Sequence, residues 1–144
     1  MTDLLDLQPT DIVLEIGTGL GYQTAILAKL AQHVYSVELI EELAVDARQR
    51  LARHGCTNVH LRVGDGRAGW PDHAPFDKII VTAAPDLIPP TLIYQLAPRG
   101  KMVIPAGLPD SQQLLLVEKD SNDTLSTHEN LPVRFSLLEE AEAA

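Results

Sequence analysis

A glycine-rich segment, EIGTGLG at residues 15–21, lies between a run of strand-forming residues and a run of helix-forming residues. Glycine has no Cβ atom, so Gly17, Gly19 and Gly21 let the backbone turn sharply and approach a ligand closely. A helix that follows such a loop presents unpaired N–H groups and a positive dipole end to an anionic group. The segment therefore indicates a ligand-binding turn, with an ordinary tight strand-to-helix connection as the alternative.

A second candidate, Glu38, ends the next expected strand, 19 residues after Gly19. A carboxylate there can accept hydrogen bonds from both hydroxyls of a ribose. The loop reads G-x-G-x-G after Glu15, whereas dinucleotide loops read G-x-G-x-x-G. An acid in the loop repels a pyrophosphate but can receive the cationic amino group of a methionine moiety, whose carboxylate can meet Thr18 and the loop amides. The pattern favours S-adenosyl-L-methionine as cofactor, with S-adenosyl-L-homocysteine as its product, over NAD.

Further candidates follow the other strands. Asp65 can accept from an adenine amino group while the backbone of Gly66 lies against the ring, although both residue types are also common in turns. Thr82 ends the fourth strand, near the expected donor methyl, or simply caps that strand. The expected cofactor-binding residues, all in the glycine loop or close to strand ends, are Glu15, Gly17, Thr18, Gly19, Gly21, Tyr22, Gln23, Glu38, Leu39, Asp65, Gly66 and Thr82.

Strands and helices alternate along most of the chain, which predicts right-handed crossovers and a parallel sheet covered on both faces. The last two strands have no helix between them, so we expect them to pair antiparallel at one edge. The fold class is therefore α/β, doubly wound and Rossmann-like, in one domain over residues 1–144. Strands are expected at 11–17, 33–39, 58–65, 76–84, 100–107, 112–120 and 132–138, and helices at 22–32, 41–55 and 89–97.

Composition excludes several classes of protein. The formal net charge of −9 argues against a large nucleic-acid-binding surface, which needs basic residues. No apolar run is long enough to cross a bilayer, and Cys56, the single cysteine, cannot form an internal disulfide. We expect a cytoplasmic protein that is a monomer or a weak oligomer, with no membrane partner. The five histidines are scattered, so no metal site and no nucleophile–base pair is expected.

Several segments resemble the protein-L-isoaspartate O-methyltransferases in order and spacing, over about residues 4–138. They are VLEIGTGLGYQTAILA, SVEL, GDGRAGW, PFDKIIVTAAP and QLAPRGKMVIPAG, of which GYQTA and VTAAP are the most discriminating. The resemblance implies methyl transfer from S-adenosyl-L-methionine to the α-carboxylate of L-isoaspartyl residues in damaged proteins, a protein-repair reaction. Because that carboxylate is already ionised at neutral pH, such a reaction needs alignment rather than a general base.

The chain departs from this family at its start. Members of the family carry several tens of residues before the glycine loop, including a G-Q-T-I-S-type segment whose serine helps to hold the substrate. MTDLLDLQPTDI does not match that segment. No catalytic residue is therefore assigned, and we expect cofactor binding to persist while isoaspartyl methylation is weak or undetectable. The alternatives are a small-molecule O-methyltransferase on the same core and a non-catalytic cofactor-binding remnant, with an NAD oxidoreductase disfavoured by the loop spacing.

Overall fold

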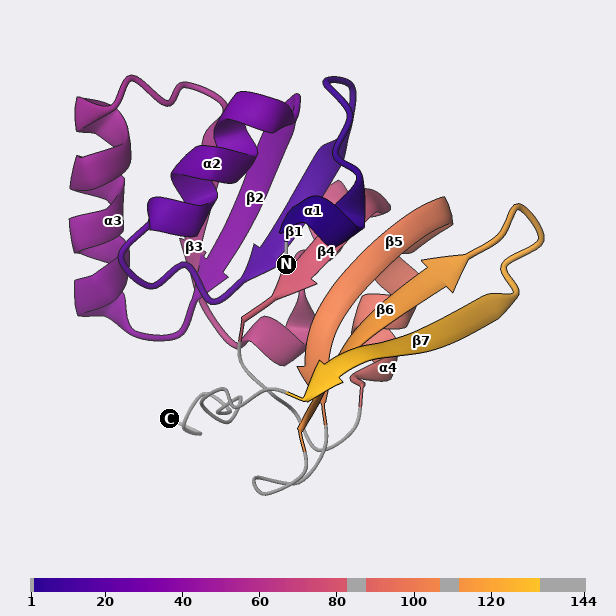
Figure 1. The fold of residues 1–144 in the computed structure, drawn as a ribbon. Helices are drawn as coiled ribbons and strands as arrows, with labels where there is room; N and C mark the ends of the chain where they lie inside the picture. Colours follow the sequence, from indigo (N-terminus) through magenta and orange to yellow (C-terminus); the bar gives the residue numbers. More distant parts are fainter. Residues whose placement is uncertain (1, 83–87, 107–111, 133–144) are drawn as a thin grey trace.

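A mixed sheet organises the molecule (Figure 1). The computed structural model describes residues 2–82, 88–106 and 112–132, and over these residues the sheet has seven strands in the order β3-β2-β1-β4-β5-β6-β7. The first five strands along the chain are parallel, and β6 and β7 are added antiparallel. The strands are β1 (Ile12–Ile16), β2 (His33–Glu38), β3 (Val59–Val63), β4 (Phe76–Val81), β5 (Leu96–Ala106), β6 (Gln113–Lys119) and β7 (Leu125–Pro132).

Helices cover both faces of the sheet (Figure 1), with α1, α2 and α3 on one face and α4 on the other. They are α1 (Thr2–Leu5), α2 (Tyr22–Leu30), α3 (Glu41–Arg53) and α4 (Pro90–Gln95), with 3₁₀ turns η1 (Gly66–Ala68) and η2 (Pro71–His73). Helix α3 has acids in its first turn and arginines in its last, as the helix dipole favours. None of the helices in the described residues is long and apolar enough to cross a bilayer.

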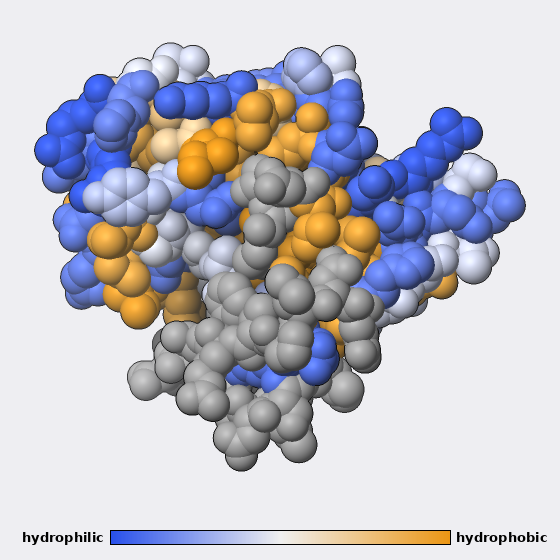
Figure 2. Space-filling model, in the orientation of Figure 1, coloured by the Kyte–Doolittle hydropathy of each residue, from blue (hydrophilic) through white to orange (hydrophobic). Residues whose placement is uncertain are grey.

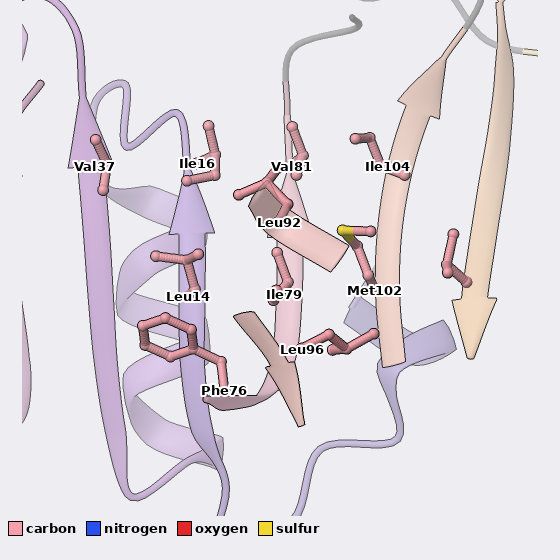
Figure 3. Close-up of a cluster of buried hydrophobic side chains, with 11 residues drawn as sticks. Leu14, Ile16, Val37, Phe76, Ile79, Val81, Leu92, Leu96, Met102 and Ile104 are labelled. Carbon is pink, nitrogen blue, oxygen red and sulfur yellow. The ribbon is translucent and has the colours of Figure 1, made fainter. Parts of the chain in front are cut away.

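Two hydrophobic clusters, one on each face, hold the sheet. On the α4 face, Leu92 packs over side chains from β1, β4 and β5 such as Leu14, Ile79 and Met102 (Figure 3). On the other face, Leu27 of α2 packs with side chains such as Val13 of β1. Because the central strands are buried on both faces, they are largely apolar rather than alternating, as IVLEI of β1 is apart from Glu15. Apolar side chains also reach the surface on the face that carries α1 and α2 (Figure 2).

The α/β, doubly wound, mostly parallel fold with antiparallel edge strands is confirmed. Two boundaries were wrong. The last strand is β7, directly after the turn at Asp120, because that side chain accepts from Asn122 and Thr124 N–H and closes the hairpin there. Of the predicted strand 132–138, all but Pro132 lies outside the described residues. Strand β5 begins at Leu96, where a helix was expected, because an irregularity in the β4–β5 pairing lets Leu96 join the ladder opposite Phe76.

Candidate functional site

The carboxyl ends of β1, β2, β3 and β4 meet at one edge of the sheet. Strand β1 lies between β2 and β4, so the strand order reverses beside it, which is where ligands bind in open α/β sheets. Backbone hydrogen bonds fix this edge: Gly17 N donates to Val37 O at 2.9 Å, and Thr82 N donates to Ile16 O at 3.0 Å. Gly64 N, after β3, likewise donates to the Glu38 carbonyl at 2.9 Å. The fold thereby brings the four predicted segments together.

The three loop glycines have different roles. All have positive φ, at 96°, 55° and 87° for Gly17, Gly19 and Gly21. A Cβ on Gly17 would collide with the Thr82 hydroxyl, and a Cβ on Gly21 would lie 3.3 Å from the Cβ of Ala47 in α3. A Cβ on Gly19 would meet no atom within 4 Å. Gly17 and Gly21 therefore permit close packing, whereas Gly19 borders open space that a ligand can fill.

Glu38 ties the loop to β2. One carboxylate oxygen, Oε1, accepts from Gly19 N at 2.7 Å, and the other, Oε2, accepts from Ile40 N at 3.0 Å. The residue is 6% exposed. Each carboxylate oxygen has two lone pairs, so both retain capacity to accept a further hydroxyl. A carboxylate held at a strand end in this way is suited to a vicinal diol such as a ribose.

Glu15 does not occupy the place expected for a ligand contact. Its side chain is fully buried, and Oε1 accepts hydrogen bonds from the hydroxyls of Thr24 and Ser36, the latter at 2.6 Å. The Thr18 hydroxyl also turns inward, 2.5 Å from the Ser36 hydroxyl. Both side chains thus have partners inside the fold, from α2 and β2, and the loop offers its backbone to a ligand. Their direct contact with a cofactor stays a prediction.

Burial dominates the electrostatics of Glu15. Desolvation raises its pKa from 4.5 to about 7, although the Ser36 and Thr24 hydrogen bonds favour the ionised form. The nearby Glu38 carboxylate raises the pKa further. Within the described residues the second oxygen, Oε2, has no hydrogen-bond partner. The carboxyl is thus poised between its neutral and ionised forms near neutral pH.

Other predicted residues lie around the same edge. Tyr22 is 62% exposed, and the Arg50 guanidinium lies 4.6 Å from its ring centroid. Arg50 also donates to Leu20 O at 2.7 Å, so α3 holds the outer part of the loop. The Thr82 hydroxyl donates to the carbonyls of Ile16 and Gly17, which makes it a brace between β4 and the loop. Gln23 and Leu39 are half-buried.

The segment after β3 is held by Gln95, a residue that sequence reasoning missed. Asp65 caps η1 by accepting from Arg67 N at 2.9 Å, and Gly66 is buried. From α4, the buried Gln95 side chain accepts from Trp70 N at 2.9 Å and donates to Ala68 O at 3.0 Å. The sequence did offer a signal for Gln95, since it is a polar residue at the end of the largely apolar segment PPTLIYQ. Ser36 and Thr24, each a polar residue within an apolar run, gave a similar one.

Replacing Gln95 by alanine is expected to destabilise the chain by about 1–3 kcal/mol, because it leaves two part-buried backbone groups without partners. Urea unfolding monitored by circular dichroism measures this loss. Tyr94→Ala, at the neighbouring position with 85% exposure, serves as the control and should change stability little. Equal stability of the two variants would show that Gln95 does not hold the 65–70 segment.

The strand order, the glycine loop after β1 and the acid ending β2 define a Rossmann-like methyltransferase fold. A solved protein-L-isoaspartate O-methyltransferase superposes with a TM-score of 0.86 at 30% identity, covering 94% of this chain and 44% of its own. A putative one from Plasmodium falciparum, solved with S-adenosyl-L-homocysteine, gives 0.79 at 21% identity, covering 95% and 68% of the two chains. The second shows the fold alone.

The chain belongs to the protein-L-isoaspartate(D-aspartate) O-methyltransferase family, whose model matches residues 1–143. It is 78% identical to protein-L-isoaspartate O-methyltransferase 1 of Polaromonas sp. strain JS666 over 142 residues, which are 99% of this chain and 60% of that protein. It is 53% identical to protein-L-isoaspartate O-methyltransferase 1 of Nitrosospira multiformis, covering 94% and 58%. The chain thus spans about three-fifths of the length of these curated relatives.

Proposed function

We propose that this protein binds S-adenosyl-L-methionine and transfers its methyl group to the α-carboxylate of L-isoaspartyl residues in damaged proteins. The observation that carries the cofactor assignment is the open space at Gly19, bordered by the Glu38 carboxylate and the start of α2. The first turn of α2 contains no acid, and its N-cap, Gly21, makes no side-chain cap. An anionic carboxylate is favoured at such a helix start. Family membership supports the reaction.

Different residues bind different parts of the cofactor. Glu38 accepts the ribose hydroxyls, and the backbone of residues 17–21 with the start of α2 receives the methionine carboxylate. Asp65 and Gly66, positioned by Gln95, receive the adenine, while Tyr22, Gln23 and Leu39 flank the site. When bound, the cofactor supplies an electrophilic methyl group on a cationic sulfonium. The chain's own contribution is to align donor and acceptor and to exclude water, because an ionised carboxylate needs no base.

The wider assignments belong to the same proposal. Residues 1–144 form a single cofactor-binding methyltransferase domain that works in the cytoplasm on damaged protein or peptide substrates. It acts as a monomer or weak oligomer, without nucleic acid or membrane.

Two measurements test the proposal. Titration calorimetry should show binding of S-adenosyl-L-homocysteine and none of NAD. Any transfer of a labelled methyl group, however slow, should go to an isoaspartyl peptide and not to the matching aspartyl peptide. NAD binding without a response to S-adenosyl-L-homocysteine would overturn the cofactor assignment. Cofactor binding without any transfer would favour the non-catalytic alternative.

Glu38→Ala is expected to weaken S-adenosyl-L-homocysteine binding by about 1.5–3 kcal/mol, because it removes a charged acceptor for the ribose hydroxyls. The variant also frees the Gly19 and Ile40 N–H groups, so its thermal unfolding must be recorded beside the calorimetry. Glu38→Gln keeps the size and one acceptor oxygen and should lose less affinity. Undiminished affinity in Glu38→Ala would remove this residue from the site.

A further inference from the structure

Three histidines that are scattered in the sequence gather around Tyr35, on the sheet face opposite α2 and α3. His60 lies beside Tyr35 in the β2–β3 register, with their rings stacked at 4.6 Å, and His73 of η2 stacks on Tyr35 at 4.3 Å. His33 begins β2, one strand repeat before Tyr35 on the same face. This cluster lies at the amino ends of the strands, away from the edge where Glu38 lies.

The spacing of His33 and His60 is unusual for a hydrogen bond. His33 Nδ1 and His60 Nε2 are 3.4 Å apart. In one tautomer this contact is a long hydrogen bond, beyond the usual range of about 2.7–3.2 Å for N–H···O bonds. Two nitrogens that ligate one tetrahedral Zn²⁺ at about 2.0–2.1 Å lie about 3.3–3.4 Å apart. Neighbouring ligands in a square plane would lie closer, at about 2.9 Å, which disfavours square-planar Cu²⁺.

We propose that His33 Nδ1 and His60 Nε2 form a surface site for Zn²⁺, with water completing its tetrahedral shell. Each ring must then carry its proton on the other nitrogen, so that the facing lone pairs are free. The two side chains come from neighbouring strands whose register is fixed by backbone hydrogen bonds, so the pair is assembled before the metal arrives. Because the backbone that carries both histidines is already ordered, less conformational entropy is lost when the metal binds.

The surroundings favour metal binding by His60. Arg62, two residues after His60 on the same face of β3, already has partners: its guanidinium lies 5.0 Å from the Trp70 ring centroid and donates to Gly69 O at 2.9 Å.

The proposed site has two protein ligands, and this number limits its affinity for Zn²⁺. No set of three or more His, Cys, Asp or Glu side chains in residues 2–82, 88–106 and 112–132 is arranged to hold a metal. Structural zinc sites use four protein ligands and catalytic ones three, so a pair binds reversibly. A bound ion would pin β3, which has β2 as its one neighbour in the described sheet, and so would stabilise the fold without touching the cofactor site.

Zinc titration of the chelator-treated chain tests the proposal, by calorimetry and by thermal unfolding. The wild-type chain should bind one Zn²⁺ and unfold at a higher temperature in its presence. His33→Asn and His60→Gln should each weaken binding about a hundredfold, because the second ligand no longer adds to the first. His73→Asn and His54→Asn are the matched controls and should bind Zn²⁺ as the wild type does.

Co²⁺ supplies a readout that does not depend on the variants folding. The wild-type chain should give the intense visible absorption of tetrahedral Co²⁺, and added Zn²⁺ should remove it. Zinc affinity that is unchanged in both His33→Asn and His60→Gln would overturn the proposal. So would an absence of Zn²⁺ binding to the wild-type chain at millimolar metal. Loss of binding in His73→Asn to the same degree would assign the site to other ligands and likewise overturn it.

Discussion

Replacing Glu15 by glutamine is expected to abolish a stability loss of about 3 kcal/mol that the wild-type chain suffers as pH rises from about 4.5 to about 7. The carboxyl is fully buried and is ionised at alkaline pH without a partner for Oε2 in the described residues. Glutamine keeps the shape and an oxygen that can accept from Thr24 and Ser36. It removes the charge that burial penalises.

The direction follows from proton binding. In the folded chain the pKa of Glu15 is raised to about 7, above the value of 4.5 for the free side chain. Between these values the folded state holds the proton and the unfolded state has released it, so the free energy of unfolding falls as pH rises. Below about pH 4.5 both states are protonated, and above about pH 7 the loss is complete.

Urea unfolding of wild type and Glu15→Gln over this pH range measures the effect. The difference between the two should grow with pH and then level off, while any constant cost of the buried amide adds equally at every pH. Asp46→Asn, at an exposed position on α3, removes the same charge and should run parallel to the wild type. A Glu15→Gln curve parallel to the wild type would show that Glu15 is not held neutral in the fold.

Gly19→Val is expected to abolish binding of S-adenosyl-L-homocysteine, with a loss of about 3 kcal/mol or more, because the valine side chain fills the space left for the ligand. The φ of 55° at Gly19 also strains a branched residue. Calorimetry on the folded variant measures the affinity, and circular dichroism shows that it is folded.

Gly55→Val is the control that distinguishes backbone strain from filling of the ligand space beside Gly19. Gly55 follows α3 with φ of 71°, and a Cβ there also meets no atom within 4 Å. It carries comparable strain but lies outside the proposed site. Gly55→Val should therefore lose stability and retain cofactor affinity. Wild-type affinity in Gly19→Val would show that no ligand occupies the space beside Gly19, and equal losses in both variants would assign the effect to strain.

Local patterns predicted most of the fold. The switch from apolar strand runs to helical periodicity located β1 through β4, and the missing helix between the last strands predicted their antiparallel pairing. The strand after Asp120 was missed because LSTHENLP is polar and lacks the apolar alternation that marks strands, and the first half of this edge strand, residues 125–128, is exposed on both faces.

The candidate site divides in the same way. The positions of Gly19 and Glu38 follow from the order of strands and loops, which the sequence makes readable. The inward turn of Glu15 and Thr18 depends on hydroxyls that α2 and β2 bring from elsewhere in the chain, and no local pattern encodes that meeting. Gln95 and the His33–His60 pair depend likewise on packing and strand register across long separations.

The contact between Gly21 and Ala47 makes the affinity for a ligand adjustable from outside the site. The glycine at 21 leaves room for the methyl group of Ala47 on α3, since a Cβ at position 21 would lie only 3.3 Å from the Ala47 Cβ. A larger residue at 47 must push the helix or the loop outward. Arg50 of the same helix donates a hydrogen bond to Leu20 O, so a shift of α3 also moves the loop. If the proposed cofactor binds at this loop, substitutions at position 47 are expected to alter its affinity while the proposed contact residues stay unchanged.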